Sequence, residues 1–242
     1  MPRCLPRFAK VSAVSEQTNS LAAVIIFDLL TFLLSISSSY LTFTYCKYIL
    51  QHINKIIKAM RMQIQTNFSS KTIPDKYGCN VTPEHLNHGI NQQSFPFQII
   101  ALPTGTSYVC WTLIDYDTIP LIGFPWIHWV VANYPVHTKT ISIAPNFSES
   151  ALLPQGRNSI DSLVQRIRHP LWRHTSFGQN LAIHYSGPRP RQGSHQYRLT
   201  VYALKALIPV ENGFYLNTLF DHLESVILDQ TSLNLSYERR QP

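Results

Sequence analysis

The sequence has few glycines and few cysteines, and neither residue follows a spacing that marks a class of protein. The 9 glycines among 242 residues show no period, which excludes a collagen-like or linker-type chain. The four cysteines, Cys4, Cys46, Cys79 and Cys110, form no CxxC pair, which excludes a zinc knuckle and a dense disulfide framework. We therefore expect buried free thiols in a protein of a reducing compartment.

The sequence also lacks the several long apolar runs of a multi-span membrane protein. Its mean hydropathy is -0.05, whereas each membrane span needs about 20 apolar residues. Hydrophobic residues still make up 45% of the chain, which is enough for a packed core and excludes disorder throughout. At roughly 100–200 residues per domain, the length suits one domain with an extension, or two small domains.

Acidic residues are scarce, but the shortage is not spread evenly along the chain. The net charge is +7, and residues 1–61, with seven basic and two acidic residues, contribute +5 of it. Residues 62–242 carry a net charge of only +2. A nucleic-acid-binding protein usually has a basic face on its folded domain, so we expect no nucleic-acid partner.

Residues 1–61 form a basic and hydrophobic extension that allows two interpretations. Residues 21–45 are long enough to span a membrane, although Asp28 would cost about 3 kcal/mol on insertion. Alternatively, the extension is an upstream segment without a role, and the functional chain opens at Met62. We expect one folded domain over residues 62–242, in a cytoplasmic protein that is membrane-associated if residues 21–45 insert.

From Met62 onward, short alternating runs broken by Pro, Gly and Asn predict β-strands. The expected strands are residues 107–115, 127–134, 181–186, 196–205 and 231–239. Helical spacing predicts two helices: 160–168, capped by Asn158 or Ser159 with an apolar face of Ile160, Leu163, Val164 and Ile167, and 218–229, capped by Asn217. Many strands and few helices indicate a mainly β protein, an antiparallel β-sandwich with a few peripheral helices.

Residues 113–135 contain polar side chains that a strand alone does not explain. Asp115 and Asp117 are two residues apart, so on an extended chain they point the same way. A Pro- and Gly-rich connection then returns to His128, which starts a strand and can lie beside them. The aspartates could orient the imidazole.

Residues 183–197 form a second polar stretch of the same kind. A predicted strand ends at Tyr185, a Gly/Pro loop follows, and His195 and Tyr197 open the next strand on one side. Together the two stretches can form a pocket at one end of a sheet, with histidines and loop N–H groups as donors. Such a pocket suits a small anion, above all a phosphate monoester with a cationic head.

At these residues the sequence resembles a known family. The pattern DYD…P…G…HW…NYP is followed, in order, by YxGPxPxxGxHxYxxxVYAL. The two motifs together resemble the phosphatidylethanolamine-binding protein family, and they are most similar to its bacterial branch of Raf-kinase-inhibitor-like proteins. The resemblance covers about residues 62–238.

This resemblance implies a β-sandwich with a central antiparallel sheet, a smaller second sheet and an anion pocket near one edge. Carried onto this chain, the ligand-binding residues would be Asp115, His128, Gly187, Pro188, His195 and Tyr197, with Asp117 and Tyr185 as supporting residues. The resemblance implies no cofactor.

Two departures from the family pattern concern the rim of this pocket. The double proline usual after Gly-Pro-x is Pro190–Arg191 here, which makes the loop less rigid and more basic. The usual Asp-Ala-Pro is replaced by the four residues from Asp117 to Pro120, with one extra residue before the proline. The identity of the ligand is therefore not transferred from the family.

The other tryptophans and histidines have a structural interpretation. We expect Trp111, Trp126 and Trp129 in the core. The remaining seven histidines are expected at the surface or in loops: His85, His88, His137, His169, His174, His184 and His222.

The leading functional hypothesis is a non-enzymatic binding protein whose partner is a phosphate-containing small molecule or a phospholipid head group. The alternative is a regulatory protein that inhibits a kinase or a protease through the same surface. A metal-dependent hydrolase that uses the same histidines and aspartates is a third hypothesis, but no HExxH or CxxC supports it. The sequence also lacks the GxSxG motif of a serine hydrolase.

Overall fold

Tyr48, Gln51 and residues 61–240 are described by the computed structural model of the chain. The apolar segment 21–45 lies outside these residues, and so do Cys4 and Cys46 of the extension. Apart from Tyr48 and Gln51, the described residues belong to one compact unit. Within the ranges that the structure describes, no helix is long and apolar enough to cross a membrane.

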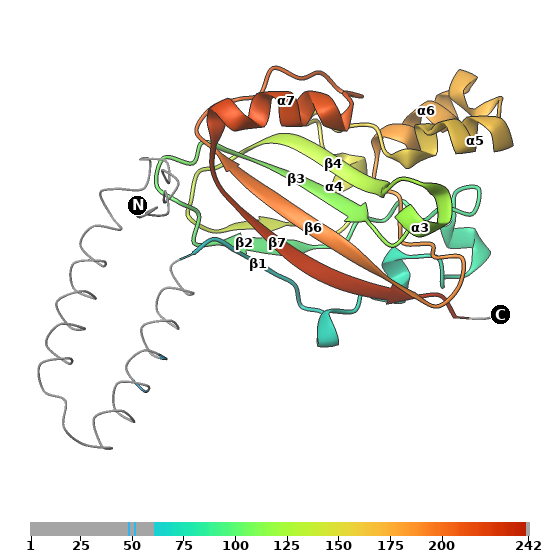
Figure 1. The fold of residues 1–242 in the computed structure, drawn as a ribbon, viewed down its shortest axis with the longest axis horizontal. Coiled ribbons are helices and arrows are strands. Elements are labelled where there is room, and N and C mark those ends of the chain that lie inside the picture. The colour runs from blue at the N-terminus through green and yellow to red at the C-terminus, as the bar shows by residue number, and fades with distance from the viewer. Residues whose placement is uncertain (1–47, 49–50, 52–60, 241–242) are drawn as a thin grey trace, which may run out of the picture. The chain divides into compact units, whose positions relative to one another are not determined.

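Two antiparallel sheets form the body of the protein, as Figure 1 shows, so the predicted mainly β sandwich is confirmed. The larger sheet has four strands in the order β4-β3-β6-β7, and the smaller has three in the order β1-β2-β5. The strands are β1 (Gln63–Gln65), β2 (Phe97–Ile100), β3 (Tyr108–Asp115), β4 (Trp126–Pro135), β5 (Ile141–Ile143), β6 (Ser194–Leu204) and β7 (Ile227–Glu238).

The core between the two sheets is rich in aromatic side chains. Phe97 of β2 meets Trp111 of β3 edge-on, with ring centroids 5.5 Å apart, and Trp111 in turn meets Trp129 of β4 at 5.3 Å. Trp111 and Trp129 are fully buried, as the sequence predicted. Edge-to-face pairs of this kind contribute about 0.5–1.5 kcal/mol each beyond the burial of their area.

Five α-helices lie among the described residues. They are α3 (Ile119–Ile122), α4 (Phe147–Ser150), α5 (Leu163–Arg168), α6 (Ser176–Ile183) and α7 (Leu216–Val226). Five short 3-10 helices lie among the described residues: η1 (Ser69–Lys71), η2 (Asp75–Tyr77), η3 (Pro83–His85), η4 (Ser159–Asp161) and η5 (Trp172–His174).

Helix α7 packs on the outer face of the four-stranded sheet (Figure 1). Its buried residues Leu219 and Leu223 join a second core with Cys110 of β3 and Val130 of β4. Strand β3 is therefore buried on both faces, and nearly all of its side chains are inaccessible. The predicted helix 218–229 is correct in place but wrong in its bounds.

The bounds of α7 differ because the chain changes structure at both ends. Asn217 lies inside the helix, which begins at Leu216 after an N-cap residue, Tyr215, without a side-chain cap bond. At the other end Ile227 leaves helical geometry and opens β7. The apolar residues at this end therefore serve the strand as well as the helix.

The predicted strand 181–186 is wrong, because its first residues belong to helix α6. Thr175 caps this helix by accepting a hydrogen bond from the Gly178 N–H at 3.0 Å. Leu181 is buried against Ile90 and Ile160, so the apolar run covers one face of a helix rather than alternating across a sheet. A short apolar run does not distinguish these two cases by itself.

The predicted single helix 160–168 is also wrong, because helical geometry is interrupted at Ser162. Ser162 has extended backbone angles, φ -68° and ψ 157°, and separates η4 from α5. Asn158 caps η4, as expected, by accepting a hydrogen bond from the Ile160 N–H. Ile160 is buried, but Leu163 and Ile167 remain 71% and 73% exposed, so the expected apolar face is not covered.

Candidate functional site

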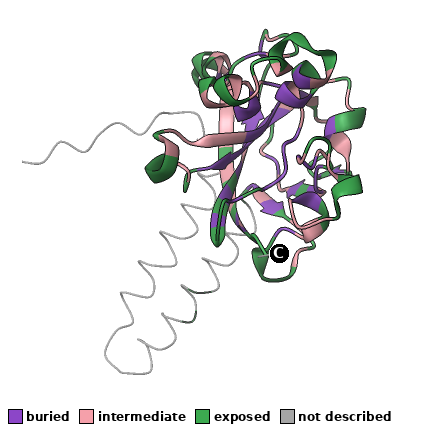
Figure 2. Ribbon diagram, turned by 90° about the vertical axis from the view of Figure 1, so that its right-hand side faces the viewer, coloured by how far each residue is buried: buried purple, intermediate pink, exposed green. Residues whose placement is uncertain are grey.

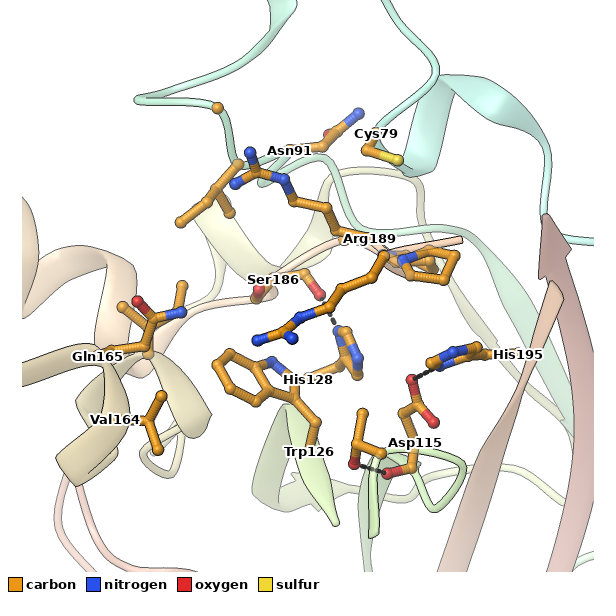
Figure 3. Close-up of a pocket in the computed structure, with 18 of the residues that line it drawn as sticks. Cys79, Asn91, Asp115, Trp126, His128, Val164, Gln165, Ser186, Arg189 and His195 are labelled. Carbon is orange, nitrogen blue, oxygen red and sulfur yellow. Dashed lines mark hydrogen bonds and ion pairs between the residues drawn. The ribbon is translucent and has the colours of Figure 1, made fainter. Parts of the chain in front are cut away.

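A pocket of about 440 Å³ lies at one end of the four-stranded sheet. Strand β3 ends here at Asp115, which is paired in register with Trp126 of β4 and Tyr197 of β6. Since both neighbours run antiparallel to β3, its last residue meets the first residues of the other two strands. Figure 3 shows Asp115 and His195 on one side of this cavity, His128 and Trp126 beside each other near its middle, and Val164 and Gln165 on the other side.

The Asp115 carboxylate is held from two directions. His195 Nδ1 lies 2.7 Å from Asp115 Oδ2 and donates its hydrogen to that oxygen. The Asp117 N–H donates to the other oxygen, Oδ1, at 2.9 Å. The His195 ring is therefore fixed in orientation, and its Nε2 atom is left for a ligand.

His128 is buried and held in the same manner by a backbone carbonyl. Its Nδ1 atom lies 2.6 Å from the Ser186 carbonyl oxygen, which can only accept, so Nδ1 carries the hydrogen. Burial lowers the pKa of His128, and this effect exceeds the opposing influence of the Ser186 carbonyl and the Asp115 charge. The neutral ring therefore keeps Nε2 for a ligand.

The hydroxyl of Tyr197 is buried and makes no hydrogen bond with any residue that the structure describes. The ring lies edge-on to His128, with centroids 5.1 Å apart. Burial, and then the nearby Asp115 charge, raise the pKa of Tyr197, so the hydroxyl keeps its hydrogen. Although Asp115 is close enough for this effect, the geometry does not give a hydrogen bond between them. A buried donor without a partner is costly, and a ligand oxygen would remove that cost.

The loop at Gly187 and Pro188 closes the next side of the pocket through close backbone contacts. The Gly187 N–H donates to the Asn91 carbonyl oxygen at 2.7 Å, and the Cys79 N–H donates to the Pro188 carbonyl oxygen at 3.0 Å. A Cβ atom at Gly187 would lie 2.6 Å from the Tyr77 carbonyl oxygen, a distance that real Cβ atoms do not show. Glycine at this position is therefore a requirement of close packing.

Asp117 and Tyr185 support the pocket from outside its lining. The extended-chain expectation fails at Asp117, because β3 ends at Asp115 and Asp117 lies in the following turn. Its carboxylate accepts a hydrogen bond from the Gln196 N–H at 2.8 Å, which joins this turn to β6. Tyr185 is fully buried beyond the end of α6, not in a strand, and its hydroxyl donates to the Tyr77 carbonyl oxygen at 2.8 Å.

The structure thus brings six of the eight predicted site residues to one cavity: Asp115, His128, Gly187, Pro188, His195 and Tyr197. Their role as ligands remains a prediction. Among the described residues, no three His, Cys, Asp or Glu side chains come together as a metal-binding group.

An arginine-rich rim, Arg168, Arg189, Arg191 and Arg239, was missed by sequence reasoning. The four side chains are exposed, and no ion pair holds any of them within the described part of the chain. Arg191 occupies the position of the missing second proline, and this was the one signal in the sequence. Arg189 lies two residues earlier in the same loop, whereas Arg168 and Arg239 come from distant segments, which no local pattern brings together.

An aromatic wall of the pocket, formed by Trp126 and Trp172, was also missed. Trp126 is half-buried: it packs against a small core cluster and also lines the pocket, so its expected place in the core is only partly correct. His169 stacks on Trp172 with ring centroids 4.0 Å apart, and His88 lies 4.0 Å from Phe177. His88, His169 and Trp172 line the pocket, so these two histidines are not merely surface residues.

The two cysteines that the structure describes are free, as expected, but only one is fully buried. Burial raises the pKa of Cys110 to about 12. Cys79 is half-buried at the pocket, and burial raises its pKa as well. Neither thiol is activated as a nucleophile.

A family model matches this chain over residues 63–238, and its description is phosphatidylethanolamine-binding protein. The protein YxkA of Bacillus subtilis is 35% identical over 161 residues, which is 66% of this chain and 90% of YxkA. The protein YbhB of Escherichia coli is 35% identical over 104 residues, covering 43% of this chain and 54% of YbhB.

Solved structures share the fold at lower identity. A putative phosphatidylethanolamine-binding protein homologue from Chlamydia trachomatis superposes with a TM-score of 0.55 at 23% identity, over 74% of this chain and 98% of its own. The Escherichia coli protein YbcL gives a TM-score of 0.54 at 18% identity, over 74% of this chain and 99% of its own. Nearly the whole length of each of these two structures is matched by this chain.

Proposed function

The chain belongs to the phosphatidylethanolamine-binding protein family, and on that premise we propose that its pocket binds a phosphate-containing small molecule or phospholipid head group without chemical conversion. The observation that carries this proposal is the buried Tyr197 hydroxyl, which lacks a partner among the described residues. It lines the pocket beside His128 and His195, whose Nδ1 atoms are already occupied. An oxyanion offers acceptor oxygens to the Tyr197 hydroxyl, and a hydrogen carried by a phosphate oxygen can be donated to the free Nε2 atom of neutral His128.

The charge around the pocket favours an anion. Four arginines line the cavity, while its one carboxylate, Asp115, already accepts two hydrogen bonds. An anion that enters therefore meets a positive rim and no free negative group. Charge-assisted hydrogen bonds to phosphate oxygens are about twice as strong as neutral ones.

The size and the aromatic wall favour an ester over inorganic phosphate alone. A cavity of about 440 Å³ falls in the range of pockets for small organic ligands. With the phosphate at the histidines, the substituent could contact Trp126, which lies beside His128, and Trp172, which also lines the cavity. A cationic substituent such as ethanolamine is attracted to the face of an indole ring.

Calorimetric titration with O-phosphoethanolamine tests this function. We expect saturable binding to the wild-type chain and at least a tenfold loss in His128→Ala, since each charge-assisted hydrogen bond contributes about 1.5–3 kcal/mol. His137→Ala is the matched control, because His137 is exposed and outside the pocket lining. No binding to folded wild-type protein, or equal binding to both variants, would contradict the proposal.

A further inference from the structure

Three exposed aliphatic side chains lie on α5 and the residues that follow it, a segment that also lines the pocket. Leu163, Ile167 and Leu171 are exposed by 71%, 73% and 73%, and no described residue covers them. They lie four residues apart, so the two within α5 share one helix face. A different face of the same segment, including Val164 and Arg168, lines the pocket.

The charged residues of this segment are all basic. Residues 163–174 contain Arg166, Arg168 and Arg173 and no acidic residue. Arg166 is paired with Asp161 at 3.0 Å, whereas Arg168 and Arg173 are exposed without an ion-pair partner in the described part of the chain. The exposed aliphatic side chains are thus interleaved with free positive charge.

Exposed aliphatic side chains also lie on the other side of the pocket. Helix α3 exposes Ile119 by 43% and Leu121 by 55%, and Leu121 also lines the pocket. Between α3 and α5, the rim carries the exposed Arg189 and Arg191. Figure 2, which faces this end of the molecule, shows exposed helices around a buried centre.

We propose that this end of the protein docks on a membrane that contains anionic phospholipids. Leu163, Ile167 and Leu171 enter the boundary between head groups and acyl chains, and Leu121 enters it on the other side of the pocket. The arginines lie at the lipid phosphates, and the pocket opens toward the membrane. Aliphatic residues beside Lys or Arg are the composition of elements that lie in a membrane interface.

Charge complementarity favours an anionic membrane as the partner of this surface. Anionic membrane surfaces attract exposed arginines, and each one adds about a fivefold increase in partitioning. The aliphatic side chains lie on separate elements around a pocket mouth, which suits a fluid surface that adapts to their arrangement. A protein partner would need a continuous complementary patch of about 800 Å².

A chain that begins at Met62 allows the test without any contribution from residues 21–45. The family match covers residues 63–238, and two solved structures are matched over 98% and 99% of their own length, so we expect this part to fold alone. We expect this chain to cosediment with vesicles of phosphatidylcholine and phosphatidylglycerol at least tenfold more strongly than with phosphatidylcholine vesicles. High salt should weaken the binding, since it screens exposed charges.

The triple variant Leu163→Ser, Ile167→Ser and Leu171→Ser should lose at least tenfold in binding to the anionic vesicles. The matched control is the double variant Leu152→Ser and Leu207→Ser, which alters exposed leucines outside the pocket lining and should bind like wild type.

Phosphoethanolamine binding measured on the same proteins separates docking from the pocket's own function. The triple variant should keep this binding, which also shows that it is folded. Absence of vesicle binding in wild-type protein that still binds phosphoethanolamine overturns the docking proposal, and leaves the aliphatic rim to a protein partner. Equal vesicle binding by the triple variant and wild type also overturns it.

Discussion

At the scale of single residues, the site depends on hydrogen bonds that fix each ring before a ligand arrives. His195 is oriented by Asp115 and His128 by the Ser186 carbonyl oxygen, so both Nε2 atoms are set in place by the fold. Preorganised ligand-binding atoms avoid the free energy of ordering mobile side chains upon binding. The orphaned Tyr197 hydroxyl is the part of the site that remains unsatisfied until an acceptor enters.

His128 makes the stability of the protein depend on pH. Burial lowers its pKa in the folded state below the ordinary value of 6.5, so the unfolded chain binds this proton more readily. The stability that neutral His128 provides is complete above pH 6.5 and decreases as the pH falls below that value. Urea unfolding at a series of pH values should show this slope, and His128→Gln should make it shallower. An unchanged slope in the variant would show that His128 is not the titrating group.

Gly187→Ala should destabilise the fold and weaken ligand binding together. The added Cβ would meet the Tyr77 carbonyl oxygen at 2.6 Å. Neither backbone can retreat easily, because the Gly187 N–H donates to the Asn91 carbonyl oxygen and the Asn91 side chain donates to the carbonyl oxygens on both sides of Tyr77. Overpacking of this kind costs about 1–3 kcal/mol in the free energy of unfolding. Gly193→Ala in the same loop is the control, since no atom lies within 4 Å and only its positive φ of 62° opposes alanine. Equal small losses in both variants would mean that the close approach is unimportant.

Some residues of the site could be predicted from sequence and others could not. Asp115, His128, His195 and Tyr197 stand at expected strand ends, where regular alternation places them in one region. Arg168 and Arg239 both line the pocket although they are 71 positions apart in the sequence. Only tertiary packing brings their flexible side chains together. Local sequence patterns contain no information on such an approach.

At the scale of elements, long strands were predicted well and short or broken elements were not. Strands β3, β4, β6 and β7 have 8 to 12 residues, enough for clear alternation or β-branched content. Strands β1, β2 and β5 have only 3 or 4 residues and were missed. Their strand conformation is fixed by pairing with one another and by packing on the aromatic core, not by a local pattern.

Helix α6 was mistaken for a strand, and its N-cap offers a test of the structure. Thr175→Ala removes the hydrogen bond from the hydroxyl oxygen to the Gly178 N–H and should lower the free energy of unfolding by about 1 kcal/mol. Ser225→Ala on α7 is the control, because its hydroxyl bonds only the carbonyl oxygen of His222 one turn earlier. Hydrogen exchange over residues 176–183 should become faster in the first variant alone. Exchange that is unaffected by Thr175→Ala would contradict the assigned cap.

At the scale of the whole molecule, the four-stranded sheet joins two hydrophobic cores into one unit. Trp111 of β3 faces the core between the sheets, and its neighbour Cys110 faces the core beneath α7. Both cores therefore share the same strand, and neither can open without disturbing the other. The pocket lies at the end of this strand, so the most buried part of the fold positions the candidate ligand residues.

A chain that begins at Met62 should consequently fold by itself in one cooperative transition. Met62 is already buried in the core between the sheets, and the family match begins at the next residue. Calorimetric and van't Hoff enthalpies of unfolding should agree for this chain, as they do for a two-state domain. Two separate transitions, or an unfolded product, would show that the boundary or the shared core is wrong.

The binding of a phosphate ester between His128 and His195 is the central claim, and the NMR signals of these two rings report on it most directly. The measurement is a titration of the chain beginning at Met62 with O-phosphoethanolamine. We expect saturable shifts of both ring signals in the wild-type protein, and no saturable shift of His195 in His128→Ala at the same concentrations. Ring signals that stay unchanged in a folded protein would contradict the claim, although the fold and the family would stand.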